Sequence, residues 1–422
     1  MSADESSASR GTLAAALAPG LALIAAVAAL GPGDGAGDVA VVSCWLAQSF
    51  AGVYLCVAAT LAARPRAPAA IARLALVGWA TLIAAGAALL IYRAARPAAP
   101  TGSTPPDSAP SDSTPSAPVI DWRADADGHE DRDWAIAYYR EFREANRAHW
   151  QPYVYWRRAA YDGRYITVDA EGRRETVQAR DLPADAPRVF VFGGSTIWGT
   201  GAANDQTIPS CLARALHDAG HPAQVVNLGE TGYVSTQGIL RLMLELRAGN
   251  VPDVAVFYDG ANELAAAAQT REPGIPMNEV RRREDFLRGE APAPPPPAER
   301  TTAQLATETV ACYRANLRVL AALAREYDFE LCCFWQPVPY LHKPLTDYEA
   351  RASGRRDLGE IMRLGYDAVA ARSMPPFFVD LSRVFAATEQ PRYVDWCHLV
   401  AAGNAQVSEA MLPRVLAALR AR

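Results

Sequence analysis

The sequence contains three residues whose side chains together could perform nucleophilic catalysis. Ser195 follows two glycines and the short apolar run Val189–Phe192, which is typical of a strand buried in a parallel sheet and ending in a sharp turn. Asp395 and His398 lie three residues apart near the C-terminus. A serine hydroxyl becomes nucleophilic when a base takes its proton, an imidazole titrates near neutrality, and a carboxylate holds the imidazole in one tautomer. These residue types predict an acyl-enzyme formed on Ser195.

Each of these residues also has a purely structural explanation when it is taken alone. Serine is a favoured N-cap, so Ser195 could simply begin the next helix. The spacing of Asp395 and His398 fits a helix cap as well, and Asn262 could be a turn-forming residue. The weight of the prediction therefore rests on the four residues occurring together.

Four stretches, in order, resemble the SGNH hydrolases, the GDSL-like esterase and lipase superfamily, over roughly residues 186 to 415. In that family a Ser, a Gly, an Asn and a His come from successive blocks, with an Asp three residues before the His. The matching stretches here read Gly-Gly-Ser-Thr, Asn-Leu-Gly-Glu-Thr-Gly, Gly-Ala-Asn-Glu and Asp-Trp-Cys-His. The matching residues are Ser195, Gly232, Asn262, Asp395 and His398. Two departures leave the subfamily open: the family's Gly-Asp-Ser is Gly-Gly-Ser here, and Glu263 stands where Asp is commoner.

The resemblance implies a catalytic triad of Ser195, Asp395 and His398. It also implies an oxyanion hole made by the backbone N–H groups of Ser195 and Gly232 and by the side-chain amide of Asn262. A three-layer α/β/α sandwich around a five-stranded parallel sheet is expected. We expect neither a cofactor nor a metal, because the cysteines lack metal-ligand spacing and no glycine-rich nucleotide loop occurs. No G-x-S-x-G elbow surrounds Ser195, which argues against the ordinary α/β-hydrolase fold.

The order of apolar runs agrees with an α/β fold, because strand-like and helix-like stretches alternate from residue 186 onward. Predicted strands are Val189–Phe192, Val225–Leu228, Val254–Tyr258, Leu331–Trp335 and Phe377–Leu381. Predicted helices are Ile208–Ala219, Thr236–Ala248, Thr302–Tyr327, Asp357–Arg372 and Ala402–Leu419. A polar insertion is predicted at 265–300, where a lid, a docking loop and a disordered surface excursion are all open.

A smaller subdomain is predicted at 119–185, ahead of the hydrolase domain at 186–422. It should contain a helix over Asp131–Trp150 and a hairpin within Tyr161–Val177. Between them, aromatic residues precede arginines, so Trp156 and Arg157 are candidate contacts for a sugar or an anionic group. The alternative is that they pack the subdomain onto the core. Glu263 is a third candidate contact, with a structural role beside the site as its alternative.

The first hundred residues are predicted to be a membrane region, 1–93, followed by a Pro/Ser-rich linker, 94–118. Three apolar stretches, Thr12–Leu30, Val39–Ala62 and Ala70–Tyr92, are each near the ~20 residues that a helix needs to cross a bilayer. Two spans plus a signal-like first helix is the alternative. The connection between the second and third stretches contains Arg64 and Arg66, whereas the first connection contains only the acidic Asp34 and Asp38. This difference predicts a cytoplasmic N-terminus and an extracytoplasmic catalytic domain.

Composition narrows the classes of partner. The net charge of −5 argues against nucleic acid as a partner. Seven cysteines without paired spacing favour free thiols, with one disulfide as the alternative. By its four motifs and its predicted membrane region, the chain resembles a membrane-anchored, bacterial type of SGNH esterase, and this resemblance implies an O-acyl ester of an envelope glycan or a lipid as substrate. An O-acyltransferase using the same triad and a non-catalytic membrane scaffold are the alternatives.

Overall fold

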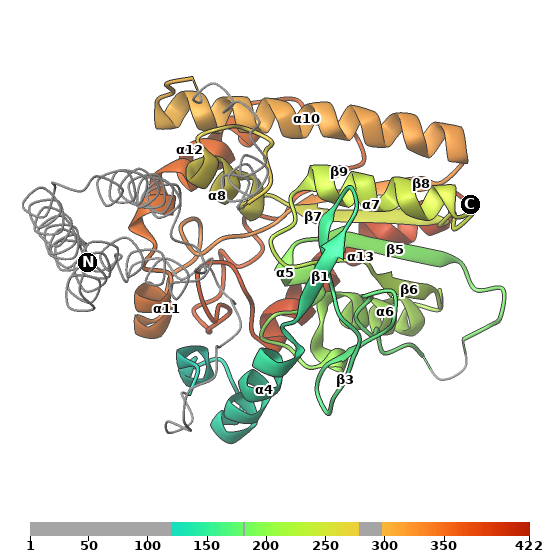
Figure 1. Cartoon of the computed structure of the whole chain (residues 1–422), viewed down its shortest axis with the longest axis horizontal. Helices are drawn as coiled ribbons and strands as arrows, with labels where there is room; N and C mark the ends of the chain where they lie inside the picture. Colours follow the sequence, from blue (N-terminus) through green and yellow to red (C-terminus); the bar gives the residue numbers. More distant parts are fainter. Residues whose placement is uncertain (1–119, 180–181, 278–297) are drawn as a thin grey trace, which may run out of the picture. The chain divides into compact units, whose positions relative to one another are not determined.

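A five-stranded parallel sheet carries the residues that the motifs single out (Figure 1). The computed structural model describes residues 120–179, 182–277 and 298–422. The strand order is β6-β5-β7-β8-β9, and all four neighbouring pairs are parallel. The strands are β5 (Arg188–Gly193), β6 (Gln224–Asn227), β7 (Val254–Asp259), β8 (Glu330–Trp335) and β9 (Phe378–Asp380). The predicted sheet is confirmed, and each strand falls on one of the predicted apolar runs.

Helices cover both faces of this sheet. Side chains alternate between the two faces along each strand, so each buried strand places apolar groups on both faces. In β5, Val189 and Val191 join the buried cluster of α6 and α13, whereas Phe190 and Phe192 join that of α7, α8, α10 and α12. The helices are α6 (Ile208–Asp218), α7 (Ser235–Arg247), α8 (Ala261–Thr270), α10 (Thr302–Tyr327), α12 (Arg356–Ala370) and α13 (Ala401–Leu419). The predicted three-layer arrangement is confirmed, and the five predicted helices end within two residues of the observed ones.

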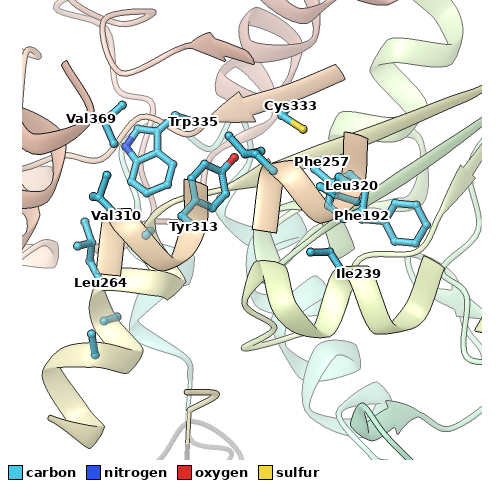
Figure 2. Close-up of a cluster of buried hydrophobic side chains, with 14 of the residues drawn as sticks. Phe192, Ile239, Phe257, Leu264, Val310, Tyr313, Leu320, Cys333, Trp335 and Val369 are labelled. Atoms are coloured by element: carbon cyan, nitrogen blue, oxygen red, sulfur yellow. The ribbon is translucent and has the colours of Figure 1, made fainter. Parts of the chain in front are cut away.

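Aromatic packing fixes the larger of these clusters (Figure 2). Phe192 of β5 and Phe257 of β7 stack with ring centroids 4.7 Å apart. Tyr313 of α10 lies 4.9 Å from Trp335 at the end of β8. Burial of each such side chain contributes about 1.5–3 kcal/mol. The strands β5 and β7 are therefore joined by stacked rings, and the end of β8 is held against α10.

Helix α8 was not predicted, and it corrects the boundary of the predicted insertion at 265–300. Residues Ala265–Ala267 are buried inside this helix, which continues to Thr270. Four consecutive alanines carry too little contrast in hydropathy to show which face of the helix is buried. The nature of the insertion beyond this point stays a prediction, because residues 278–297 lie outside the described part of the chain.

The N-terminal segment forms short elements around one helix. They are η1 (Trp122–Asp125), α4 (Arg132–Ala145), β1 (Ala148–Gln151), β2 (Tyr155–Arg158), β3 (Tyr161–Asp162) and β4 (Thr167–Val168). The helix predicted over Asp131–Trp150 ends early, because its last residues form β1, which pairs antiparallel with β2. The predicted hairpin is present where Val168 of β4 bridges to Arg174 across the turn at 169–172, and β4 also pairs antiparallel with β3.

This segment packs against the turn that follows β5. Tyr138 and Phe142 of α4 share a buried cluster with Trp198. Trp198 is the last residue of the short helix α5 (Ser195–Trp198), which begins with the predicted nucleophile. The N-terminal segment is thus part of the support of the site.

The predicted membrane spans, Thr12–Leu30, Val39–Ala62 and Ala70–Tyr92, and the linker at 94–118 lie outside the described residues. Within the described residues, no helix combines the length and the apolar composition needed to span a bilayer. The five cysteines of the described part are free thiols, as favoured from their spacing.

Candidate active site

The predicted nucleophile lies at the carboxyl end of a central strand, where ligands bind in open α/β sheets. Ser195 is the first residue of α5 and follows Gly194, which occupies the N-cap position without a side-chain cap. Ser195 is therefore not the cap of this helix, and the purely structural explanation of its position is wrong. Its side chain is free to contact other groups of the site.

One of those groups is His398, in the loop before α13. Ser195 Oγ lies 2.7 Å from His398 Nε2, and His398 Nδ1 lies 2.6 Å from Asp395 Oδ2. All three residues are buried, with between 5% and 9% of the residue surface exposed. The structure therefore brings the three predicted residues into one continuous hydrogen-bonded chain, from hydroxyl to imidazole to carboxylate.

The two oxygens of Asp395 have separate tasks, which explains the three-residue spacing. Oδ1 accepts hydrogen bonds from the backbone N–H groups of Cys397 (3.0 Å) and His398 (2.9 Å), as a turn cap would. Oδ2 remains for the imidazole. Burial acts to raise the pKa of Asp395, but the His398 imidazole and the Arg123 guanidinium hold that pKa well below its usual range. Asp395 is thus an anion that can fix the ring and stabilise its protonated form.

Two further predicted residues meet beside Ser195. Asn262 Nδ2 donates a hydrogen bond to the carbonyl oxygen of Tyr233 (2.8 Å), the residue after Gly232. Gly232 has a φ of +74°, a conformation that glycine adopts without strain. Among the described residues, the backbone N–H groups of Ser195 and Gly232 donate to no acceptor. Three donors from the segments that follow β5, β6 and β7 thus converge at one edge of the sheet.

The convergence of these donors requires glycine at position 194, because a side chain there would leave no room for Asn262. The φ of Gly194 is −82°, so any residue could adopt its backbone conformation. A Cβ at this position, however, would lie 2.2 Å from Asn262 Nδ2. Position 194 therefore carries glycine, in place of the Asp of Gly-Asp-Ser, where the Asn262 amide occupies the space that a Cβ would need.

Glu263, a predicted substrate contact, is hydrogen-bonded to the protein backbone. Its carboxylate accepts hydrogen bonds from the backbone N–H of Gly260 (2.7 Å) and from that of Ser235 (2.6 Å). The first contact caps α8 and the second holds the start of α7. Both oxygens are therefore engaged in tying together the two loops that carry Gly232 and Asn262, which fits the structural alternative.

Trp156 and Arg157 lie on opposite faces of β2, because neighbouring side chains in a strand alternate. Trp156 Nε1 donates to the carbonyl oxygen of Thr231 (2.8 Å), and its ring lies 3.5 Å from where a Cβ on Gly232 would be. Arg157 is buried and donates to the carbonyl oxygen of Glu171 in the adjoining turn. The structure thus brings Trp156 to the edge of the site, whereas Arg157 contacts the N-terminal segment.

A buried ion pair strengthens the contact between β2 and the loop that carries Gly232. Glu230 accepts from the backbone N–H of Arg158 (2.8 Å), and its Oε1 lies 3.3 Å from Arg158 Nε. Arg158 also donates to the hydroxyl of Thr231. Strand β2 therefore holds the loop that carries Gly232 by both backbone and side-chain contacts.

The loop that carries Asp395 and His398 has its own anchor in α11 (Asp347–Ala352). Glu349 Oε1 accepts from the backbone N–H groups of Arg392 (2.8 Å) and Tyr393 (3.0 Å). Glu349 Oε2 pairs at 2.6 Å with Lys343, the only lysine of the chain, and both side chains are almost fully buried. Sequence patterns gave no indication of this anchor, because its partners are joined only by the fold.

Arg123 is a second residue that sequence reasoning missed. It lies in η1, and its NH1 is 3.9 Å from Asp395 Oδ2. Nothing in the sequence distinguishes it from the other thirty-nine arginines. Only the packing of the N-terminal segment places it beside the predicted triad.

One group of three potential metal ligands occurs among the described residues, namely Asp395, Cys397 and His398. Two ligands of one zinc ion, each about 2.0–2.2 Å from it at a tetrahedral angle, lie more than 3 Å apart. Asp395 Oδ2 and His398 Nδ1 are 2.6 Å apart, which is a hydrogen bond. This group therefore has the geometry of a catalytic pair and not of a metal site.

Comparison with known proteins gives distant likenesses. No family model and no curated protein matches the sequence. A crystal structure of an acetyl xylan esterase is 16% identical, with a TM-score of 0.34, over 54% of this chain and 99% of that one. A lipase/acylhydrolase from Enterococcus faecalis is 18% identical, with a TM-score of 0.33, over 56% and 96%. A protein described as lipolytic and of the G-D-S-L family, from Desulfitobacterium hafniense DCB-2, is 10% identical, with a TM-score of 0.32, over 55% and 99%. None of these likenesses is close enough to carry a conclusion about activity.

Proposed function

We propose that this protein is a serine esterase of the SGNH type, which cleaves a carboxylic ester through an acyl-enzyme on Ser195. The observation that supports this most strongly is the chain of hydrogen bonds from Ser195 Oγ through His398 to Asp395, with contacts of 2.7 and 2.6 Å. Such short contacts between buried groups are the arrangement that activates a serine hydroxyl. A non-catalytic scaffold would have no need to keep these three groups aligned.

The reaction follows from the positions of the donors and acceptors. Ser195 Oγ attacks the ester carbonyl carbon while His398 Nε2 takes the hydroxyl proton. The negative charge moves to the carbonyl oxygen, where the N–H groups of Ser195 and Gly232 and the amide of Asn262 stabilise it. As the intermediate collapses, the C–O bond to the alcohol breaks, and the leaving oxygen takes the proton from His398.

The second half of the reaction releases the acyl group. A water molecule attacks the ester carbonyl of the acyl-enzyme while His398 Nε2 takes one of its protons. The bond to Ser195 Oγ then breaks, and Oγ recovers its proton from His398. Asp395 stays ionised throughout and stabilises the imidazolium in both halves. The products are a carboxylic acid and an alcohol, and no cofactor takes part in any step.

The substrate that we propose is an O-acyl ester on an envelope glycan or a lipid. The support comes from the sequence, since the membrane region predicted at 1–93 would hold the hydrolase domain at an extracytoplasmic surface. Trp156 at the edge of the site is the proposed substrate contact, because its ring borders Gly232. Arg157 and Glu263 do not take part in this proposal, since Arg157 donates to the carbonyl oxygen of Glu171 and both carboxylate oxygens of Glu263 accept from backbone N–H groups.

The alternative of an O-acyltransferase uses the same acyl-enzyme. It differs only in the nucleophile of the second half, which would be a sugar hydroxyl in place of water. No contact among the described residues favours one acceptor over the other. The esterase is the simpler proposal because water needs no binding site of its own.

Hydrolysis of p-nitrophenyl acetate by the full-length protein tests the proposal. Activity should be present in the native protein and fall to the background rate in Ser195→Ala. Ser373→Ala, the same change at an exposed serine, is the matched control and should retain full activity. Equal rates in the native protein and in Ser195→Ala would exclude Ser195 as the nucleophile. Addition of an acylatable glycan then separates the two acceptors, because transfer to sugar in preference to water would identify an acyltransferase.

A further inference from the structure

The candidate triad has a charged neighbour that comes from outside the hydrolase core. Arg123 NH1 lies 3.9 Å from Asp395 Oδ2, the same oxygen that contacts His398. The guanidinium is mostly buried, 4.9 Å from the ring centroid of Tyr139 and 5.3 Å from that of Phe142. Its position is thus fixed by two aromatic rings of α4.

A second ion pair holds Arg123 in this place. Arg123 Nε donates to Asp121 Oδ1 (3.0 Å), and NH2 donates to Asp121 Oδ2 (2.8 Å). Burial acts to lower the pKa of Arg123, but the hydrogen bonds to Asp121 and the nearby anions hold that pKa above its usual range. Arg123 is therefore a permanent cation that faces two carboxylates, Asp121 and Asp395.

Apart from Asp127, the other ionisable groups around this cluster are neutral near pH 7 or are paired elsewhere. Burial raises the pKa of the nearby tyrosines and of Cys397, and it lowers the pKa of His129, whose Nε2 contacts the carbonyl oxygen of Arg123. Arg355, which faces Cys397, is paired with Asp357 at the surface. The groups concerned are Tyr139, Tyr340, Tyr348, Cys397, His129, Arg355, Asp357 and Asp127, in addition to Asp395, His398, Asp121 and Arg123. Arg123 and Asp121 are therefore the charges best placed to act on the triad.

We propose that Arg123 is a positioning residue that, through Asp395, sets the lower pH limit of catalysis, and that Asp121 moderates its effect. This inference rests on the proposed function. Activity requires unprotonated His398, so the acid limb of the pH profile follows the stability of the imidazolium. A cation beside Asp395 offsets part of the negative charge that stabilises the imidazolium. Arg123 thus keeps His398 available as a base at lower pH.

Removal of either charge should move the acid limb of the pH profile, and the two directions are opposite. Removal of the Arg123 charge makes the imidazolium more stable, so the acid limb moves to higher pH. Removal of the Asp121 charge leaves Arg123 less neutralised, so the acid limb moves to lower pH. One full charge at this separation, in a partly screened site, gives a shift of roughly 1 pH unit. Opposite shifts from two neighbouring residues are not expected from loss of packing.

The experiment is the pH dependence of kcat/KM for p-nitrophenyl acetate, measured on the full-length protein. We expect the acid limb to move up by about 1 unit in Arg123→Gln and down in Asp121→Asn, and to stay in place in Arg123→Lys. Arg132→Gln is the matched control, because Arg132 forms an exposed ion pair with Asp125 in the same segment. The control should leave the limb unchanged.

An unmoved limb in Arg123→Gln, or shifts of the same sign in both variants, would overturn the inference. If Arg123→Gln does not fold, Asp121→Asn decides alone, since Asn can still cap η1 and only a downward shift supports the inference. Failure of the proposed function is a separate result, because the native protein would then show no hydrolysis that depends on Ser195.

Discussion

The change of Gly194 to Ala adds a single methyl group to the site and should remove most of its activity. The backbone of Gly194 has a φ of −82°, so alanine fits there without strain and the protein should remain folded. The new Cβ would lie 2.2 Å from Asn262 Nδ2, whereas ordinary contact begins at 3.4 Å. The amide of Asn262 must therefore retreat by about 1 Å, and a displacement of that size can lower a rate about 100-fold.

The loss should appear in kcat. Asn262 is proposed to stabilise the oxyanion, which exists in the transition state and not in the bound ester, so KM should change little. Loss of one oxyanion donor lowers kcat about 10²–10³-fold, or about 2.7–4 kcal/mol. The assay is steady-state hydrolysis of p-nitrophenyl acetate. Gly359→Ala in α12 is the matched control, because its Cβ meets only Tyr340, at 3.6 Å, and kcat should not change.

A double-mutant cycle tests the reason for the loss. If Gly194→Ala acts by displacing the Asn262 amide, the change should cost little once Asn262 is already alanine. The double variant should then be no slower than Asn262→Ala by itself. Multiplication of the two losses, or a Gly194→Ala variant within about threefold of the native kcat, would refute the reasoning, since even one displaced donor predicts a larger effect.

Two further variants test the anchors of the site. Trp156→Phe keeps a ring beside Gly232 but loses the hydrogen bond to Thr231. Its kcat should therefore fall roughly 3–10-fold, which corresponds to about 1 kcal/mol. Trp122→Phe is the control, because Trp122 is 53% exposed, and it should leave kcat unchanged. An unaltered kcat in Trp156→Phe would show that this bond does not position the loop. Lys343→Met leaves Glu349 buried without its partner and should lower the free energy of unfolding in urea by about 3–5 kcal/mol. Arg355→Met breaks an exposed pair and should cost less than about 1 kcal/mol, and equal losses in the two variants would contradict this account.

The strands and most helices could be predicted because their sequence patterns are local. A strand buried on both faces is a continuous apolar run, as in residues 254–258 of β7. An amphipathic helix such as α10 repeats its buried residues about every three to four positions. Helix α8 lacks such contrast, since Ala265–Ala267 are buried and Ala268 is half-buried. The sequence pattern therefore does not separate the second half of α8 from the insertion predicted at 265–300.

The chemical groups could be predicted because four motifs occur in a fixed order, whereas the residues that position them could not. Arg123 and Asp395 are far apart in the sequence, and only the packing of η1 and α4 brings them together. The division of roles between Trp156 and Arg157 depends on which face of β2 meets the Gly232 loop. That face is decided by the pairing of β2 with β1 and by the contact with Thr231, neither of which the sequence pattern contains.

The most direct test of the central claim is the reaction of the full-length protein with a fluorophosphonate, followed by mass measurement of the intact chain and of its peptides. An activated serine in this site should take up one adduct on Ser195, and the reaction should be much slower in His398→Ala, where the base is missing. Ser195→Ala should take up none. An adduct of equal yield in Ser195→Ala, or one located on another residue of the native protein, would contradict the assignment of Ser195 as the nucleophile.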